Sequence, residues 1–199
     1  MERARELLSG WRGEPSFEYG ESEVAKAAIE TALIRAHREL FGVIFWFIVL
    51  PGPAGAVLYR LAAEVARRWG SRKDEEFAAF GRFATRAFHY LDWVPLRLSA
   101  IGFAIAGDFE DAVSSWRAQS AGWSDPDEGI ILASGAGALG VQLGGPLPRK
   151  GGVDFRPDLG DGDPADANHL QSAMYLLWRT LIVWIVLLLL LTLARWVGT

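Results

Sequence analysis

The stretch LIVWIVLLLLLTLA, residues 181–194, contains no charged residue and lies between Arg179 and Arg195. As a helix its fourteen residues would rise about 21 Å, less than the ~30 Å hydrocarbon core of a bilayer. Residues 173–197 are long enough to span that core if Arg179 reaches toward the headgroups or faces protein. Three tryptophans suit the membrane interface: Trp178, Trp184 and Trp196. The alternative is the core helix of a soluble protein, but five consecutive leucines leave no polar face. We therefore expect a membrane anchor.

A second apolar stretch, LFGVIFWFIVLPGPAGAVLY at residues 40–59, also carries no charge. Its length suits a membrane span, but Pro51 and Pro53 fall at its centre. Each proline lacks an amide N–H and disfavours helical geometry in the residue before it. We therefore expect two short helices joined at the Pro-Gly-Pro corner, as a re-entrant hairpin or a broken span. A soluble helical hairpin is the alternative.

The next segments alternate polar and amphipathic character. Residues 64–76 are predicted to form a polar connector, and their basic side chains favour a position on the cytoplasmic side of a membrane. The alternative is that they form the solvated face of a helix. Residues 77–107 predict an amphipathic helix at the interface, a break at Pro95 and then a partly buried helix. Asp108 and the acidic residues after it are expected to cap the following helix.

The fold class that these patterns predict is all-α. We expect an integral membrane protein with broken or re-entrant and interfacial helices plus one C-terminal transmembrane helix. Residues 129–145 are rich in glycine, alanine and serine, which permits close helix packing. Four regions follow: a soluble lead-in (1–21), a membrane and interfacial helical core (22–145), a flexible polar linker (146–168) and the terminal transmembrane helix (169–199).

Composition excludes several classes of function. A net charge of −4 argues against general nucleic-acid binding, which requires a basic surface. The chain has no cysteine, which excludes disulfides, iron–sulfur clusters and thiolate zinc sites. The sequence is charged from Glu2 onward and shows no apolar region of a cleaved signal peptide, so insertion would rely on internal segments.

The remaining polar residues carry no catalytic signature. The histidines lack metal-ligand spacing and are expected to be structural: His37, His89 and His169. Residues 135–140 match a loose G-x-G-x-x-G pattern, but no suitable strand is expected before them, so a dinucleotide site is not predicted. The acidic run from Asp154 to Asp166 matches no EF-hand and predicts solvated turns. We expect no metal site.

Arginines within or beside apolar segments are costly unless they are paired or snorkel to the interface. Four lie in such positions: Arg82, Arg86, Arg97 and Arg179. Carboxylates available for pairing are Glu30, Asp92, Glu110 and Asp111. Such a cluster around residues 136–145 could bind an anionic ligand, although simple snorkelling explains the arginines as well.

Several ordered motifs resemble those of the CobD/CbiB family of cobalamin biosynthesis. AGALGVQLGG at residues 136–145 is similar to the family's AGALGVRLGG signature, and DWVPLRL at 92–98 resembles its W-x-P-x-R-L segment. The latter is similar, more closely still, to a stretch of AmpE, an inner-membrane protein of the same group tied to β-lactamase induction. Region 27–59 also follows the family, with AAIET, VIFWF and GPAGAVLY in order. The resemblance covers roughly residues 22–145, with the terminal helix behind.

The resemblance also shows departures from the synthase branch of the family. Polar positions of that branch are replaced by alkyl or cationic residues or otherwise changed: Ile34, Arg35, Arg38, Ala63, Glu64, Ala66 and Arg67. Its N-A-G motif corresponds here to Asp127-Glu128-Gly129. Additional membrane helices usually open the family's sequences, so a truncated start or a shortened paralogue is expected.

The ligand-binding candidates implied by the resemblance are Glu30, Arg97, Gly129, Gly135, Gly137, Gly140, Gly144 and Gly145. Arg97 would hold a phosphate through its planar guanidinium group. No catalytic residue is assigned.

Three functions remain open on the sequence. The first is an AmpE-like regulatory or ligand-sensing protein without enzymatic activity or cofactor. The second is adenosylcobinamide-phosphate synthase, which ligates cobyric acid to an aminoalcohol phosphate and would use ATP and Mg²⁺. The third is a structural protein that assists complex assembly. Of these we favour the first, so the chain is expected not to be an enzyme. We expect an inner-membrane location, multi-pass or partly re-entrant. The expected partners are the lipid bilayer and a membrane protein, a corrinoid or another anionic small molecule.

Overall fold

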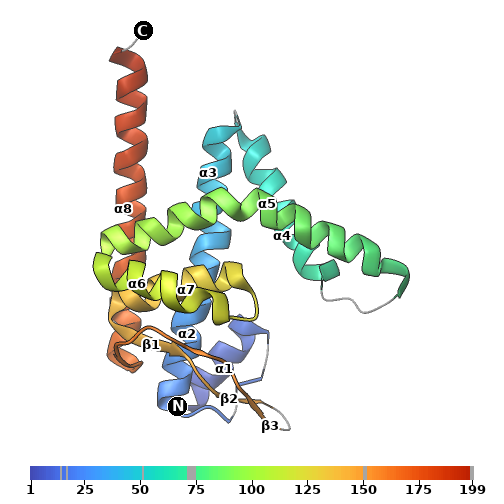
Figure 1. Ribbon diagram of the computed structural model, residues 1–199, viewed down its shortest axis with the longest axis vertical. Helices are drawn as coiled ribbons and strands as arrows, with labels where there is room; N and C mark the ends of the chain where they lie inside the picture. Colours follow the sequence, from blue (N-terminus) through green and yellow to red (C-terminus); the bar gives the residue numbers. More distant parts are fainter. Residues whose placement is uncertain (14, 17, 51, 71–74, 150–151, 198–199) are drawn as a thin grey trace. The chain divides into compact units, whose positions relative to one another are not determined.

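The computed structural model describes residues 1–13, 15–16, 18–50, 52–70, 75–149 and 152–197. Helices make up 79% of it, which confirms the predominantly helical fold class. The chain divides into two compact units, residues 1–34 with 100–199 (unit 1) and residues 35–99 (unit 2). Two helices contribute to both units: α2 (Glu21–Ala36) and α5 (Glu75–Ala106) (Figure 1).

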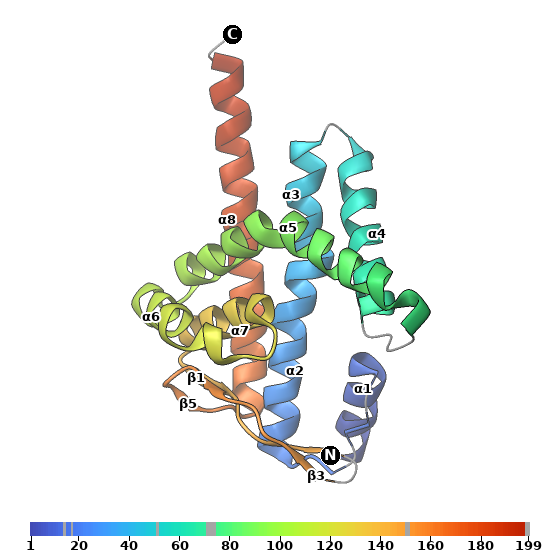
Figure 2. The ribbon, with the colours of Figure 1, turned by 45° about the vertical axis from the view of Figure 1, so that its right-hand side comes forward.

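The C-terminal helix α8 (Ala167–Val197) is the one helix among the described residues that is long and apolar enough to cross a membrane. Its first half belongs to the core of unit 1, where the buried Thr180 and Trp184 face Gly102 of α5. From Ile185 onward most of its side chains are apolar and exposed. In both views this second half extends away from the other elements of unit 1 (Figures 1 and 2). The long apolar helix predicted over residues 169–199 is therefore present.

Unit 1 has a core centred on helix α7 (Pro126–Leu139), most of whose small side chains are buried. Helix α6 (Phe109–Gln119) and the short 3₁₀ helix η2 (Ser120–Gly122) pack against α7. This close packing is the arrangement that the glycine- and alanine-rich composition of the segment predicts.

Aspartate side chains cap the starts of α6 and α7. The carboxylate of Asp108 accepts a hydrogen bond from the N–H of Asp111 at 3.0 Å, as predicted. Asp125 accepts one from the N–H of Asp127, also at 3.0 Å, where the sequence predicts only a turn. Each contact satisfies one amide group that a helix leaves unpaired at its start.

The N-terminal segment is part of the unit 1 core. Residues 1–21 are predicted as a soluble lead-in, yet helix α1 (Glu2–Arg12) buries Leu8 against Val24, Ala27 and Leu147. Apolar burial of this kind is the main favourable term in folding, so the segment contributes to the stability of unit 1.

Short strands occupy the region between residues 141 and 164, where the sequence predicts a linker over 146–168. Their bounds are β1 (Val141–Gly144), β2 (Leu147–Arg149), β3 (Gly152–Asp154), β4 (Asp158–Leu159) and β5 (Asp163–Pro164). β1 pairs antiparallel with β4 and parallel with β5, while β2 and β3 form an antiparallel pair. Strands of two to four residues are too short to show alternating hydrophobicity, which explains why the sequence pattern does not mark them.

Unit 2 contains a helical hairpin at the predicted Pro-Gly-Pro corner. Helix α3 (Gly42–Val49) and helix α4 (Pro53–Gly70) lie so close that a Cβ atom on Gly55 would be 2.0 Å from the carbonyl oxygen of Trp46. Leu50, the residue before Pro51, is extended, as the proline requires. The two predicted helices are confirmed, and Pro51 itself lies outside the described residues. Apolar side chains exposed on the hairpin are Phe47, Ile48, Val49, Val57, Leu58 and Leu61.

The predicted polar connector over residues 64–76 is helical in its first part. Helix α4 continues to Gly70, and Glu64 accepts hydrogen bonds from Arg67 and Arg68 on its surface. Residues 71–74 lie outside the described residues. The described part of the connector is therefore helical and carries ion pairs on its surface.

The predicted break at Pro95 is wrong, because α5 runs through this residue. A proline inside a helix leaves the carbonyl four residues earlier without its usual N–H donor. Here that carbonyl belongs to Leu91, and it accepts a hydrogen bond from Nε1 of Trp46 at 3.2 Å. A side chain from α3 thus replaces the missing backbone donor.

Candidate functional site

Glu30, one of the predicted site residues, lies in a buried polar cluster of unit 1. Its two carboxylate oxygens accept hydrogen bonds from Nη1 and Nη2 of Arg156 at 2.8 and 3.1 Å. The backbone N–H of Gly144 also donates to Glu30, at 2.9 Å. Arg156 uses its Nε to donate to the carbonyl oxygen of Gly145 at 3.1 Å. This two-pronged ion pair satisfies the buried carboxylate and fixes the chain at Gly144 and Gly145.

The Gly144–Gly145 pair forms a turn that only glycine adopts readily. Both residues have φ of +70°. A Cβ atom on Gly144 would lie 2.2 Å from the carbonyl oxygen of Pro157, so no side chain fits. The guanidinium of Arg156 lies 5.1 Å from the centre of the Trp123 ring, within range of a cation–π contact. The end of the AGALGVQLGG motif is therefore held by an ion pair and an aromatic ring.

The other predicted glycines of this region lie where helices touch. A Cβ atom would lie 2.6 Å from Leu33 if placed on Gly135, 2.3 Å from the carbonyl of Asp111 if placed on Gly137, and 2.4 Å from that of Ser120 if placed on Gly129. Gly140 ends α7 in the left-handed conformation, with φ of +64°. Their geometry serves helix packing and termination, and their role in ligand binding stays a prediction.

Arg97 belongs to unit 2, whereas Glu30 and the glycine motif belong to unit 1. Its guanidinium stacks over the ring of Trp93 at 4.0 Å and donates to the Trp93 carbonyl oxygen at 2.9 Å. Because a guanidinium carries five N–H groups, this arrangement leaves donors for a further contact. The phosphate-binding role of Arg97 stays a prediction.

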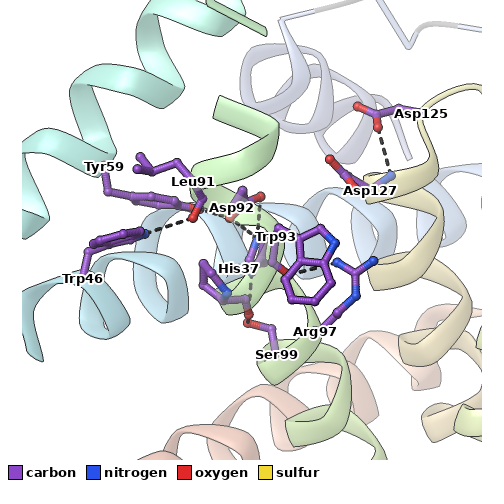
Figure 3. Close-up of polar contacts among 11 residues, drawn as sticks. His37, Trp46, Tyr59, Leu91, Asp92, Trp93, Arg97, Ser99, Asp125 and Asp127 are labelled. Atoms are coloured by element: carbon purple, nitrogen blue, oxygen red, sulfur yellow. Dashed lines mark hydrogen bonds and ion pairs between the residues drawn. The ribbon is translucent and has the colours of Figure 1, made fainter. Parts of the chain in front are cut away.

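A second buried polar cluster, in unit 2, joins three helical elements (Figure 3). Nε2 of His37, in the π-helical segment η1 (His37–Phe41), lies 3.0 Å from both carboxylate oxygens of Asp92 on α5. The hydroxyl of Tyr59 on α4 donates to Asp92 at 2.7 Å. Nδ1 of His37 lies 2.9 Å from the hydroxyl of Ser99. All four side chains are at most 3% exposed.

The hydrogen-bond partners fix most of the protons in this cluster. Ser99 donates its hydroxyl hydrogen to the Pro95 carbonyl oxygen at 2.9 Å, so it accepts from Nδ1–H of His37. One proton then remains between Nε2 of His37 and the Asp92 carboxylate. The phenol of Tyr59 donates its hydroxyl hydrogen to the Asp92 carboxylate. The Ser99 hydroxyl is buried and donates its hydrogen to a backbone carbonyl, so this Ser–His–Asp set cannot act as a nucleophile on a substrate.

The sequence predicts different partners for these carboxylates. Glu30 pairs with Arg156, which lies in the predicted linker, and Asp92 pairs with His37, which is expected only to be structural. His37 lies in the π-helical turn at residues 37–41, close to Asp92. The spacing of apolar residues in a sequence does not predict where such a turn forms. The acidic residue beside Trp93 in the DWVPLRL motif is the one sequence feature that could have pointed to this cluster.

No group of three or more metal-ligating side chains occurs among the residues that the structure describes. The two clusters above each contain one carboxylate, which is the donor type that Mg²⁺ uses together with substrate phosphates. Both carboxylates already accept hydrogen bonds from cationic or phenolic groups, so we assign neither of them to a metal.

Comparison with known proteins identifies the relatives of this chain. The sequence profile described as CobD/Cbib protein matches residues 1–177. The chain belongs to the CobD/CbiB family. It is 41% identical over 169 residues to the cobalamin biosynthesis protein CobD of Stutzerimonas stutzeri, which covers 85% of this chain and 55% of the relative. The CobD protein of Chromobacterium violaceum is 36% identical, covering 92% and 58%. CbiB of Salmonella typhimurium is 28% identical, covering 89% and 57%.

The CobD/CbiB chain thus spans little more than half the length of these relatives. No solved structure matches it. The relatives are named as cobalamin biosynthesis proteins, so the expectation that the chain is not an enzyme is wrong. The link to AmpE and β-lactamase induction rests on one short motif, whereas the CobD/CbiB match extends over residues 1–177.

Proposed function

We propose that this chain contributes to an amide-forming step of cobalamin biosynthesis, in which cobyric acid is joined to an aminoalcohol phosphate. The observation that supports the proposal is the CobD/CbiB match over residues 1–177, with relatives named as cobalamin biosynthesis proteins. A carboxylate and an amine do not condense in water without activation, so ATP would supply the free energy for the loss of water. ATP and Mg²⁺ are therefore the co-reactants we expect.

The Glu30 cluster is the part of unit 1 that we assign to substrate binding. The side chain of Arg156 is 14% exposed, so it is in contact with solvent while it remains paired with Glu30. Guanidinium groups bind carboxylate and phosphate oxygens with good geometry. Arg97 of unit 2 is the second guanidinium that we assign to a phosphate.

We also propose that the protein resides in the inner membrane. The most apolar 18-residue window within residues 167–194 has a mean hydropathy of 2.4, and only 17% of that window is buried within the protein. An exposed surface this apolar is stable in lipid and costly in water. The α3–α4 hairpin of unit 2 also exposes apolar residues, which supports a re-entrant segment in addition to the α8 span.

Complementation of a strain that lacks its corrinoid synthase tests the enzymatic proposal. Two proteins are compared: the chain as it stands, and the S. stutzeri relative in which this chain replaces the matching segment. We expect at least the chimera to restore growth without added cobinamide and to form the amide product from cobyric acid, detected by mass spectrometry. Absence of product from both proteins, each present in membranes, would overturn the proposal.

Carbonate extraction of membranes tests the location. We expect the chain to stay in the membrane pellet at alkaline pH and to require detergent for release. A variant that lacks residues 185–197 serves as the comparison, because it keeps the buried first half of α8, including Thr180 and Trp184. Release of the intact chain by carbonate alone would contradict the membrane assignment.

A further inference from the structure

The part of helix α5 that belongs to unit 2 carries an exposed apolar stripe. Its members recur at steps of three or four residues, so they share one face of the helix. The stripe consists of Phe80, Phe83, Ala87, Tyr90, Val94 and Leu98, all of them exposed. Phe83 and Tyr90 are 69% and 72% exposed, which is costly for aromatic rings in water. Apolar surfaces of this kind mark contacts with a membrane or with another protein.

The opposite face of α5 packs against the other helices of unit 2. A Cβ atom on Gly81 would lie 2.4 Å from the carbonyl oxygen of Trp69 in α4. The ring centres of Phe88 and Tyr59 are 5.5 Å apart, and Asp92 is buried on the same side of α5. The packing of unit 2 therefore uses one face of α5 and leaves the apolar stripe pointing outward.

A row of cationic side chains runs beside the stripe. Arg82 and Arg86 lie one turn apart and are exposed, and neither makes a hydrogen bond or an ion pair with a residue that the structure describes. Arg97 continues the row and keeps the role proposed for it above. Asp92 is the one acidic residue between positions 78 and 98, and it is buried. The exposed side of this segment therefore combines apolar surface with positive charge that no carboxylate of the segment balances.

This combination fits the boundary of a membrane better than the membrane interior or a second copy of the chain. Arginines are costly in hydrocarbon, and α5 is not apolar enough to be a candidate span. Helices at the boundary bury an apolar face among the acyl chains and keep arginine side chains at the headgroups. A second copy would bring the same arginines and no exposed carboxylate from this segment. An anionic surface supplies the negative charge that the arginines lack.

We propose that α5 of unit 2 lies in the membrane interface and binds the headgroups of anionic phospholipids. The apolar stripe enters the upper part of the acyl region, and Arg82 and Arg86 pair with phosphates of lipids that carry net negative charge. The inference rests on the proposed membrane location and deepens it, because it names the class of lipid that the protein selects. It does not depend on the synthase proposal.

Quenching of a single fluorophore by lipids tests the proposal on the full chain reconstituted in bilayers. The chain has no cysteine, so Ala87→Cys allows one label to be placed on the stripe. Lipids with brominated acyl chains quench a label that they touch, and brominated phosphatidylglycerol is compared with brominated phosphatidylcholine. We expect strong quenching, with a preference for phosphatidylglycerol of about fivefold for each arginine. A label at His89→Cys, exposed and about 200° around the helix, is the control and should be quenched little.

Arginine variants in the Ala87→Cys background separate headgroup binding from simple contact with lipid. Arg82→Gln combined with Arg86→Gln should abolish the preference for phosphatidylglycerol while both lipids still quench the label. Arg82→Lys combined with Arg86→Lys keeps the charge and should retain most of the preference. Arg3→Gln combined with Arg117→Gln removes two exposed charges from unit 1 and should leave the preference unchanged.

Several results would overturn the inference. One is equal quenching by the two lipids when Arg82 and Arg86 are intact, and another is an equal loss of preference in the Arg3→Gln, Arg117→Gln variant. A label at position 87 that neither lipid quenches, in a chain that resists carbonate extraction, would show that protein covers the stripe. Energy transfer between labelled copies would then identify a second copy as the cover. Release of the chain by carbonate would instead reject the membrane location itself, so the two failures are distinguishable.

Discussion

Among the residues that the structure describes, each unit buries one carboxylate, and the partners of these two carboxylates differ in exposure. Glu30 and Asp92 are equally buried, at 4% and 3% exposed. The cationic partner of Glu30 is 14% exposed at its side chain, whereas the histidine partner of Asp92 is 2% exposed. The Glu30 cluster is therefore in contact with solvent along the Arg156 side chain, whereas the side chains of the Asp92 cluster are almost fully buried. The comparison teaches that burial of a charge does not by itself mark a binding site.

We expect the largest loss of stability from substitutions in the almost fully buried Asp92 cluster. Asp92→Ala removes the partner of Nε2 of His37 and of the Tyr59 hydroxyl and leaves these two buried groups unsatisfied. We expect the free energy of unfolding to fall by about 3–5 kcal/mol, the usual cost of breaking a buried pair. Denaturation in detergent, followed by tryptophan fluorescence, measures the change. Asp92→Asn keeps one acceptor oxygen and should lose less; equal stability of Asp92→Ala and the wild type would contradict the structural role.

The sequence predicts the helical elements of unit 2 better than the cluster that joins them. Apolar length and two prolines are enough to predict α3 and α4, because both act locally on the backbone. His37 and Asp92 are 55 residues apart and meet only after three helical elements pack. The continuation of α5 through Pro95 likewise depends on a donor from Trp46, which no local pattern contains.

In unit 1 the sequence predicts Glu30 and the glycine turn but not what holds them. The family resemblance singles out Glu30, Gly144 and Gly145, and the structure brings these three together. Arg156 is missing from the prediction because it lies in a segment that reads as a polar linker. Its role depends on the pairing of β1 with β4, which are four and two residues long.

Substitutions in the Glu30 cluster should cost the protein less stability and more function than substitutions in the Asp92 cluster. Glu30→Gln keeps an acceptor for Gly144 but removes the charge that Arg156 requires. We expect the free energy of unfolding to fall by about 1.5–3 kcal/mol, as for a hydrogen bond to a charged group. A double-mutant cycle with Arg156→Gln should show a coupling between the two sites. Additive effects would show that the pair does not act as a unit.

Gly137 in α7 and Gly140 at its C-terminal end allow a test of whether these glycines serve helix packing or ligand binding. Gly137→Ala places a methyl group 2.3 Å from the Asp111 carbonyl oxygen, so α6 and α7 must move apart. We expect a loss of about 1–3 kcal/mol, as for overpacking of a core. Gly140→Asn is the control, because this position has open space and asparagine tolerates its positive φ. Stability unchanged in Gly137→Ala, with loss of phosphate binding, would favour a ligand role for this glycine.

The smallest expected effect tests how α5 passes through Pro95. Trp46→Phe keeps an aromatic ring against the helix but removes the Nε1–H that donates to the Leu91 carbonyl oxygen. We expect a loss of about 1 kcal/mol, the net value of one hydrogen bond. Trp93→Phe is the matched control, since Trp93 is 46% exposed and its ring still stacks under Arg97. If the two variants are equally stable, the hydrogen bond from Trp46 of α3 is not needed for α5 to continue through Pro95.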